Sequence, residues 1–145
     1  MFRLVPHTAD VAIEAQGGSE GEALAAAATG LTALVAGQDD PRDLPATTEM
    51  AFDVEAPDLP ALAVAFLSEL VWLQEADELL WVTGGVQVTA TDDGGLRARA
   101  RANAAPVEGN VDGGVEVKAV TYHDLAFERR GDGGAAWFLR VVVDL

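Results

Sequence analysis

Residues 50–73 read MAFDVEAPDLPALAVAFLSELVWL, and two hydrophobic periods meet inside this stretch. Met50, Phe52 and Val54 alternate with small or acidic residues, which is typical of a half-buried strand. After Asp58, which is a suitable N-cap, apolar residues recur every three or four positions and predict an amphipathic helix that tolerates Pro60 in its first turn. The apolar stripe is broad, so we expect this helix to be the better buried of two. The stripe consists of Leu62, Phe66, Leu70 and Leu73, widened by Ala63, Leu67 and Val71.

The other helix is predicted upstream. Ser19 followed by Glu22 has the spacing of a capping box, apolar residues then repeat at helical period, and Gly37 stands where a C-terminal cap glycine belongs. Residues 11–16 alternate in polarity and predict a short strand that ends at a pair of glycines.

Downstream of residue 80 the hydrophobic period is two. A hairpin turn is predicted at 92–95 (DDGG), a strand begins at Val115 and runs towards Tyr122, another carries Leu125 and Phe127, and the last strand covers 137–144. The order is therefore strand, helix, strand, helix and then several antiparallel strands. We predict an α+β fold, with two helices packed on a mainly antiparallel sheet in one domain, residues 1–145.

Composition excludes several classes of chemistry. The 145 residues include no cysteine, which rules out disulfides, iron–sulfur ligation and thiol catalysis, and only two histidines, too few for a three-histidine zinc site. No apolar run reaches the roughly 20 residues of a membrane span, and the N-terminal residues lack a signal-peptide pattern. We therefore expect a soluble cytoplasmic protein that does not enter a membrane.

The formal net charge of -15 bears on partners. Such a charge repels phosphate backbones, so strong direct nucleic-acid binding is not expected. The basic stripe formed by Arg97, Arg99 and Arg101 has the alternation of a solvated strand face. Acidity of this degree suits a basic protein partner or a cation, and it also serves solubility.

Two clusters offer candidate functional side chains. The first is His7-Thr8-Ala9-Asp10, which enters the first predicted strand; an Asx-type turn is the alternative use of this aspartate. The second runs from Lys118, the only lysine, to Tyr122, His123 and Asp124. A phosphate or partner contact and a solvated strand lysine both remain open for Lys118. His123 and Asp124 are sequence neighbours, and neighbours on a regular strand point to opposite faces.

The last predicted strand brings Asp144 and the main-chain carboxylate of Leu145 together. Two carboxylates this close repel each other unless a cation or an arginine, such as Arg140, lies between them.

Three segments of the chain resemble the signature segments of the archease family: residues 6–13 (PHTADVAI), 117–123 (VKAVTYH) and 140–145 (RVVVDL). Residues 66–70 (FLSEL) resemble that family's second helix. The resemblance implies an α+β protein that is not itself an enzyme and has no catalytic residues of its own. It implies instead an activator of the RtcB-type tRNA-splicing RNA ligase, which promotes ligase guanylylation and multiple turnover.

The resemblance also implies site residues. Asp10, Asp144 and the Leu145 carboxylate would hold a divalent cation, calcium first and magnesium or manganese as alternatives, and oxygen ligands suit all three ions. His7, Lys118, Tyr122 and His123 would contact the partner or a phosphate. Two other hypotheses stay open: a stand-alone metal-dependent hydrolase, and a chaperone or modulator of RNA-modifying enzymes.

Overall fold

The computed structural model describes residues 1–6, 10–132 and 134–145. Its elements in chain order are β1 (Phe2–Pro6), β2 (Asp10–Gly17), α1 (Glu20–Ala36), the short 3-10 helix η1 (Pro41–Asp43), β3 (Thr48–Ala56), α2 (Leu59–Ala76), β4 (Leu79–Ala90), β5 (Leu96–Pro106), β6 (Ala119–Arg129) and β7 (Trp137–Asp144).

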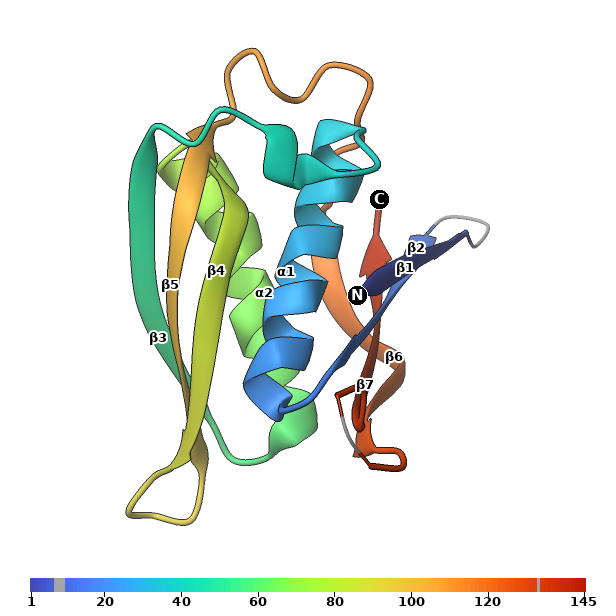
Figure 1. Cartoon of the computed structure of the whole chain (residues 1–145), viewed down its shortest axis with the longest axis vertical. Helices are drawn as coiled ribbons and strands as arrows, with labels where there is room; N and C mark the ends of the chain where they lie inside the picture. Colours follow the sequence, from blue (N-terminus) through green and yellow to red (C-terminus); the bar gives the residue numbers. More distant parts are fainter. Residues whose placement is uncertain (7–9, 133) are drawn as a thin grey trace.

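The strands form two sheets with the helices between them (Figure 1). One sheet has the order β1-β2-β7-β6 and the other the order β3-β5-β4, and every strand pair is antiparallel. Each helix contacts both sheets, α1 through β2 and β4 and α2 through β6 and β3. The predicted α+β class is confirmed, and its strands are divided into two layers rather than one.

The predicted helix ends are confirmed by their capping contacts. Ser19 Oγ accepts a hydrogen bond from the Glu22 N–H, and Asp58 caps α2 by accepting one from the Ala61 N–H. Gly37 closes α1 in the left-handed region, at φ 67°, where its N–H donates to Ala33 O. These local signals act within one turn of the chain, which is why the sequence alone located them.

The prediction that the second helix is the better buried is wrong. Eleven residues of α1 are buried, against six of α2. The stripe of α2 carries larger side chains, but α1 lies centrally and also contacts β1, β7 and η1. Its small residues permit close approach: a Cβ added at Gly21 would lie 2.0 Å from Val86 O on β4. Burial here follows position between the sheets, not side-chain size.

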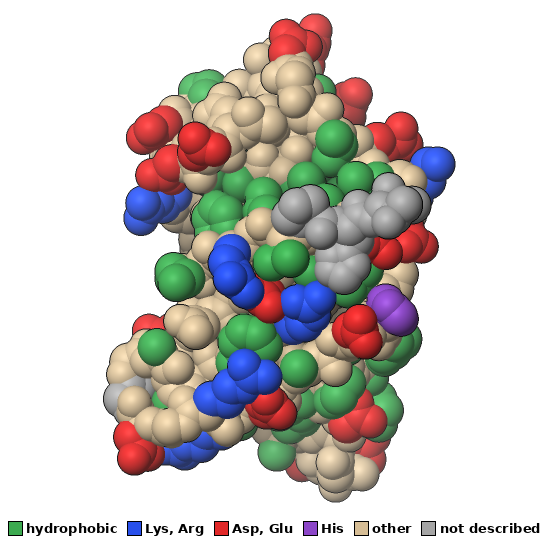
Figure 2. Space-filling view, turned by 90° about the vertical axis from the view of Figure 1, so that its right-hand side faces the viewer, with side chains coloured by type: hydrophobic (Ala, Val, Ile, Leu, Met, Phe, Trp, Pro, Cys, Tyr) green, Lys and Arg blue, Asp and Glu red, His purple; other side chains and the backbone are tan. Residues whose placement is uncertain are grey.

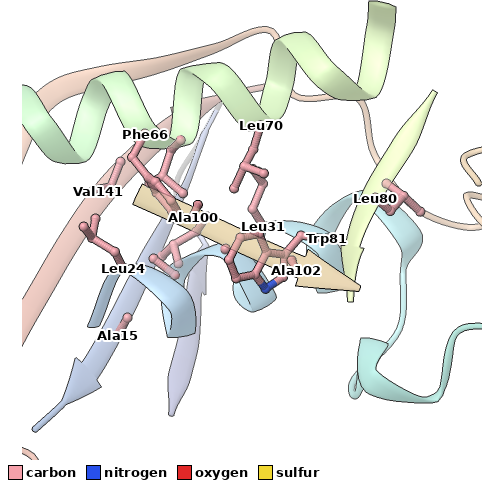
Figure 3. Close-up of a cluster of buried hydrophobic side chains, with 14 of the residues drawn as sticks. Ala15, Leu24, Leu31, Phe66, Leu70, Leu80, Trp81, Ala100, Ala102 and Val141 are labelled. Atoms are coloured by element: carbon pink, nitrogen blue, oxygen red, sulfur yellow. The ribbon is translucent and has the colours of Figure 1, made fainter. Parts of the chain in front are cut away.

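One hydrophobic core joins the helices to both sheets (Figure 3). The Phe66 ring lies 5.5 Å from that of Phe52 and 6.0 Å, edge to face, from that of Trp81, so α2 is fixed to β3 and β4. On the other side Ile13, Leu139 and Val141 are fully buried. This packing holds β2 and β7 rigidly, and these two strands carry the candidate site.

By length and hydropathy alone, α2 would pass for a membrane span. Its apolar stripe is buried against the sheets, with Leu62, Phe66 and Leu67 fully inaccessible to solvent. Its apolarity is therefore that of a core helix.

Candidate cation site where β2 meets β7

The two central strands of the four-stranded sheet, β2 and β7, place two aspartates opposite each other. Asp10 begins β2, Asp144 ends β7, and the antiparallel register pairs their Cα atoms directly. Residues opposite each other in such a pair extend from the same face of the sheet, with Cβ atoms about 5 Å apart. Asp10 Oδ1 is buried, whereas Asp144 is exposed. Two carboxylates 134 positions apart in the chain thus share one surface.

A third segment reaches the same place from β6. Ala119 pairs with Asp144 on its other side, and the Lys118 N–H donates to Asp144 O at 2.8 Å. Lys118 is exposed, and Leu145 is partly buried against the core. The sequence-predicted residues Asp10, Lys118, Asp144 and Leu145 are therefore brought together at one end of the sheet.

The donor set fits a hard cation. Carboxylate oxygens are the preferred ligands of Ca²⁺, Mg²⁺ and Mn²⁺. Across residues 1–6, 10–132 and 134–145, no group of three His, Asp or Glu side chains could hold a metal, so the two aspartates have no third side chain of these kinds beside them there. Within the same residues Asp144 forms no ion pair. Arg140 is four residues from Asp144, about 13 Å along the strand. Its Nη1 donates a hydrogen bond to Glu14 Oε2 at 2.7 Å. His7, the remaining residue of the predicted site near Asp10, lies outside the described residues.

Tyr122 and His123 lie on a bulge of β6. The β6–β7 register is interrupted between Thr121 and Ala126, and three more residues are used on β6 than on β7. Asp124 has φ 50°, unusual for a residue other than glycine, and the bulge leaves Tyr122 61% exposed. The expectation that His123 and Asp124 point apart is wrong, because His123 Nε2 lies 3.3 Å from Asp124 Oδ2. The left-handed backbone at Asp124 breaks the alternation on which that expectation rested.

The prediction that a strand begins at Val115 is also wrong. β6 begins only at Ala119, and the Val115 N–H donates to Leu34 O at the C-terminal end of α1. Gly114 packs so tightly on α1 that an added Cβ would lie 1.8 Å from Val35 O. The segment is therefore held by a helix end rather than by a neighbouring strand.

A charge network that the sequence did not reveal lies on the outer face of the four-stranded sheet. The carboxylate of Glu14 on β2 accepts hydrogen bonds from Arg3 of β1 and from Arg140 of β7, and the Glu14 side chain is only 12% exposed. Figure 2 shows this face, where basic and acidic side chains are interspersed with hydrophobic ones. Partial burial disfavours the charged form of Glu14, but hydrogen bonds and charges from Arg3 and Arg140 outweigh burial and lower its pKa. Only the register could show this network, since Glu14 and Arg140 are 126 residues apart.

The arginine stripe lies on the outer face of the other sheet. Arg97 pairs with Glu55 at 2.9 Å and, more loosely, with Asp53 at 3.9 Å, while Arg99 and Arg101 are exposed. Part of its charge is thus neutralised by neighbouring acids on β3.

The fold and the site define a class of α+β protein. Such a protein has one core, two antiparallel sheets and a pair of aspartates where β2 meets β7. Comparison with known proteins supplies the family. The model of the Archease protein family matches residues 2–145. The protein archease of Thermococcus gammatolerans is 34% identical over 140 residues, covering 96% of this chain and 94% of that protein. The archease of Pyrococcus furiosus is 32% identical over the same length, with the same coverage.

A solved structure agrees with the sequence comparisons. The solution structure of Methanobacterium thermoautotrophicum protein 1598 superposes with a TM-score of 0.73 at 26% identity, covering 99% of this chain and 98% of that one. The chain belongs to the archease family. Proteins of this family are known as cofactors of RNA ligases.

Proposed function

We propose that this protein activates an RtcB-type tRNA-splicing RNA ligase in the cytoplasm, by promoting guanylylation of the ligase and its repeated turnover. Membership of the archease family supports the ligase as partner. The pairing of Asp10 with Asp144 is the observation that carries the proposal, because it gives this family member a charged site at one end of its sheet.

In this proposal Asp10, Asp144 and the Leu145 main-chain carboxylate hold a divalent cation, with Ca²⁺ preferred and Mg²⁺ or Mn²⁺ as alternatives. A cation held there would supply positive charge to offset phosphate oxygens in a partner's active site. The protein's own contribution is positioning, since the core fixes β2 and β7 and each strand fixes one aspartate.

Lys118, Tyr122 and His123 are proposed as contacts to the ligase or to a phosphate that it binds. Lys118 adjoins Asp144 through its backbone, and the bulge turns Tyr122 and His123 outward. In this proposal the exposed Lys118 side chain offers its ammonium group to a phosphate oxygen. His7 belongs to the same proposal by its place in the signature segment. The overall charge of -15 supports contact with the ligase rather than with RNA.

A guanylylation assay tests the proposal. The ligase, at trace concentration, is incubated with GTP and Mn²⁺ or Mg²⁺, with and without this protein, and transfer of labelled guanylate to the ligase is followed. We expect faster guanylylation and more than one ligation per ligase molecule only when the protein is present. Asp144→Asn is expected to reduce the stimulation at least tenfold, while Asp92→Asn, at the exposed β4–β5 turn, leaves it unchanged.

The hydrolase hypothesis gives the opposite result. Turnover of a phosphoester by the pure protein without ligase, lost in Asp144→Asn, would replace the activator proposal.

A further inference from the structure

A groove of about 260 Å³ lies between α2 and the segment that follows β5. Its walls are mainly apolar, and six valines from α1, α2 and that segment line it: Val35, Val71, Val107, Val111, Val115 and Val117. Val115 is 39% exposed, high for a residue of its kind. An open hollow with such walls gains free energy when an apolar side chain displaces its water.

The groove is fixed by backbone contacts. The segment from 107 to 118 crosses over the C-terminal ends of the helices (Figure 1). It is tied there by the Val115 N–H bond to Leu34 O and by the close packing of Gly114 on Val35. A wall held in this way loses little conformational entropy when a partner binds.

The charge around the groove is negative. Glu75 and Glu116 are among its lining residues, and both are exposed. The sequence has no lysine or arginine in residues 43–96 or 102–117, which include α2 and the crossing segment as far as Val117; Lys118, the last residue of that segment, is its one cation. The C-terminal ends of both helices add their partial negative charge on this side. A partner segment that complements this surface carries lysine or arginine beside its apolar residue.

The segment that lines the groove also reaches the candidate cation site. Val117 lines the groove, and the next residue, Lys118, donates its N–H to Asp144 O. A partner seated in the groove would therefore lie against the segment that leads directly into β6, the strand that pairs with Asp144.

We propose that this valine-lined groove is a docking site for the ligase, and that it receives an apolar side chain flanked by basic residues from the ligase surface. The inference rests on the proposed function and adds to it a second surface, which supplies affinity while the aspartate pair supplies the effect on guanylylation.

The test measures ligase guanylylation as a function of the concentration of this protein. The groove variant is Glu75→Lys with Glu116→Lys; the matched control is Glu49→Lys with Asp92→Lys, which makes the same change in net charge at exposed positions away from the groove. A third variant, Val115→Asp, alters the apolar wall. We expect the groove variants to raise the half-saturating concentration about tenfold or more, with the plateau of stimulation retained, and the control to match the wild type. A thermal-unfolding midpoint equal to that of the wild type verifies that each variant keeps the fold.

The failures of the two proposals can be told apart. If the wild type stimulates the ligase and the groove variants have its half-saturating concentration, the docking proposal is overturned and the proposed function stands. If the wild type gives no stimulation, both are overturned. Light scattering adds one more outcome: a dimer that the groove variants dissociate would make a second copy of this chain the occupant and overturn the ligase as partner.

Discussion

Glu14 is a carboxylate held between two arginines, and this makes it a source of pH-dependent stability. Its pKa in the folded protein lies below the usual value of about 4.3. A group with a lowered folded-state pKa contributes stability above its unfolded pKa, and that stability is lost as pH falls through the folded pKa.

We therefore expect the free energy of unfolding to fall as the pH is lowered below about 4, in part because Glu14 takes up a proton on unfolding. Denaturant unfolding at a series of pH values measures the effect in the wild type and in Glu14→Gln. The variant is expected to be the less stable at pH 7 and to show a smaller loss on acidification. Parallel pH profiles for the two proteins would contradict the assignment.

Asp124 is a second residue whose local conformation determines what can replace it. At φ 50° the left-handed region costs a β-branched residue about 1–2 kcal/mol, whereas asparagine tolerates it. We expect Asp124→Val to destabilise the protein by roughly that amount and Asp124→Asn to be nearly neutral, as measured by thermal unfolding. Equal effects of the two substitutions would show that the bulge relaxes freely.

At the scale of elements, the junction between α1 and the 107–118 segment depends on the absence of a side chain at Gly114. A Cβ there would meet backbone at Val35, which a rotamer change cannot relieve. We expect Gly114→Ala to destabilise the protein by about 1–3 kcal/mol and to weaken ligase docking, since one wall of the groove must move.

Gly85→Ala on β4 is the matched control, because a Cβ at that position would meet nothing within 4 Å. Alanine there is expected to be neutral or to stabilise the protein by up to about 1 kcal/mol, through the unfolded state. A Gly114→Ala protein as stable as Gly85→Ala would mean that the crossing segment is not held by α1.

At the scale of the whole molecule, the candidate cation site joins strands from opposite ends of the chain. A cation that binds only the folded state stabilises it by about 2.7 kcal/mol at 100 times its dissociation constant. We expect Ca²⁺ to raise the unfolding temperature of the wild type and to have no effect on Asp144→Asn.

The stability of the metal-free proteins is a second, independent test of the cation site. With a chelator present, Asp144→Asn is expected to be at least as stable as the wild type, because it removes the repulsion between two adjacent carboxylates. Residues appended after Leu145 are expected to lower cation affinity if its main-chain carboxylate is a ligand. Calorimetric titration that finds equal Ca²⁺ affinity in all three proteins would overturn the proposed ligand set.

The sequence by itself determined the elements whose signals are local. Capping at Ser19 and Asp58, the C-terminal glycine of α1, the β4–β5 turn and the bounds of β7 were all predicted, because each depends on residues a few positions apart. Through family resemblance it also named the aspartates that the structure brings together. It did not show how they meet, since alternation gives the face of a strand but not its neighbour.

Tertiary structure alone decided the rest. The division of strands into two sheets, the deeper burial of α1, the Glu14 network and the valine-lined groove all depend on pairing and packing between segments far apart in the chain. Local propensity carries no information on such contacts, because their free energy comes from the neighbours that the fold supplies. The β6 bulge shows this most directly: one left-handed residue reversed the orientation that strand periodicity predicts for His123 and Asp124.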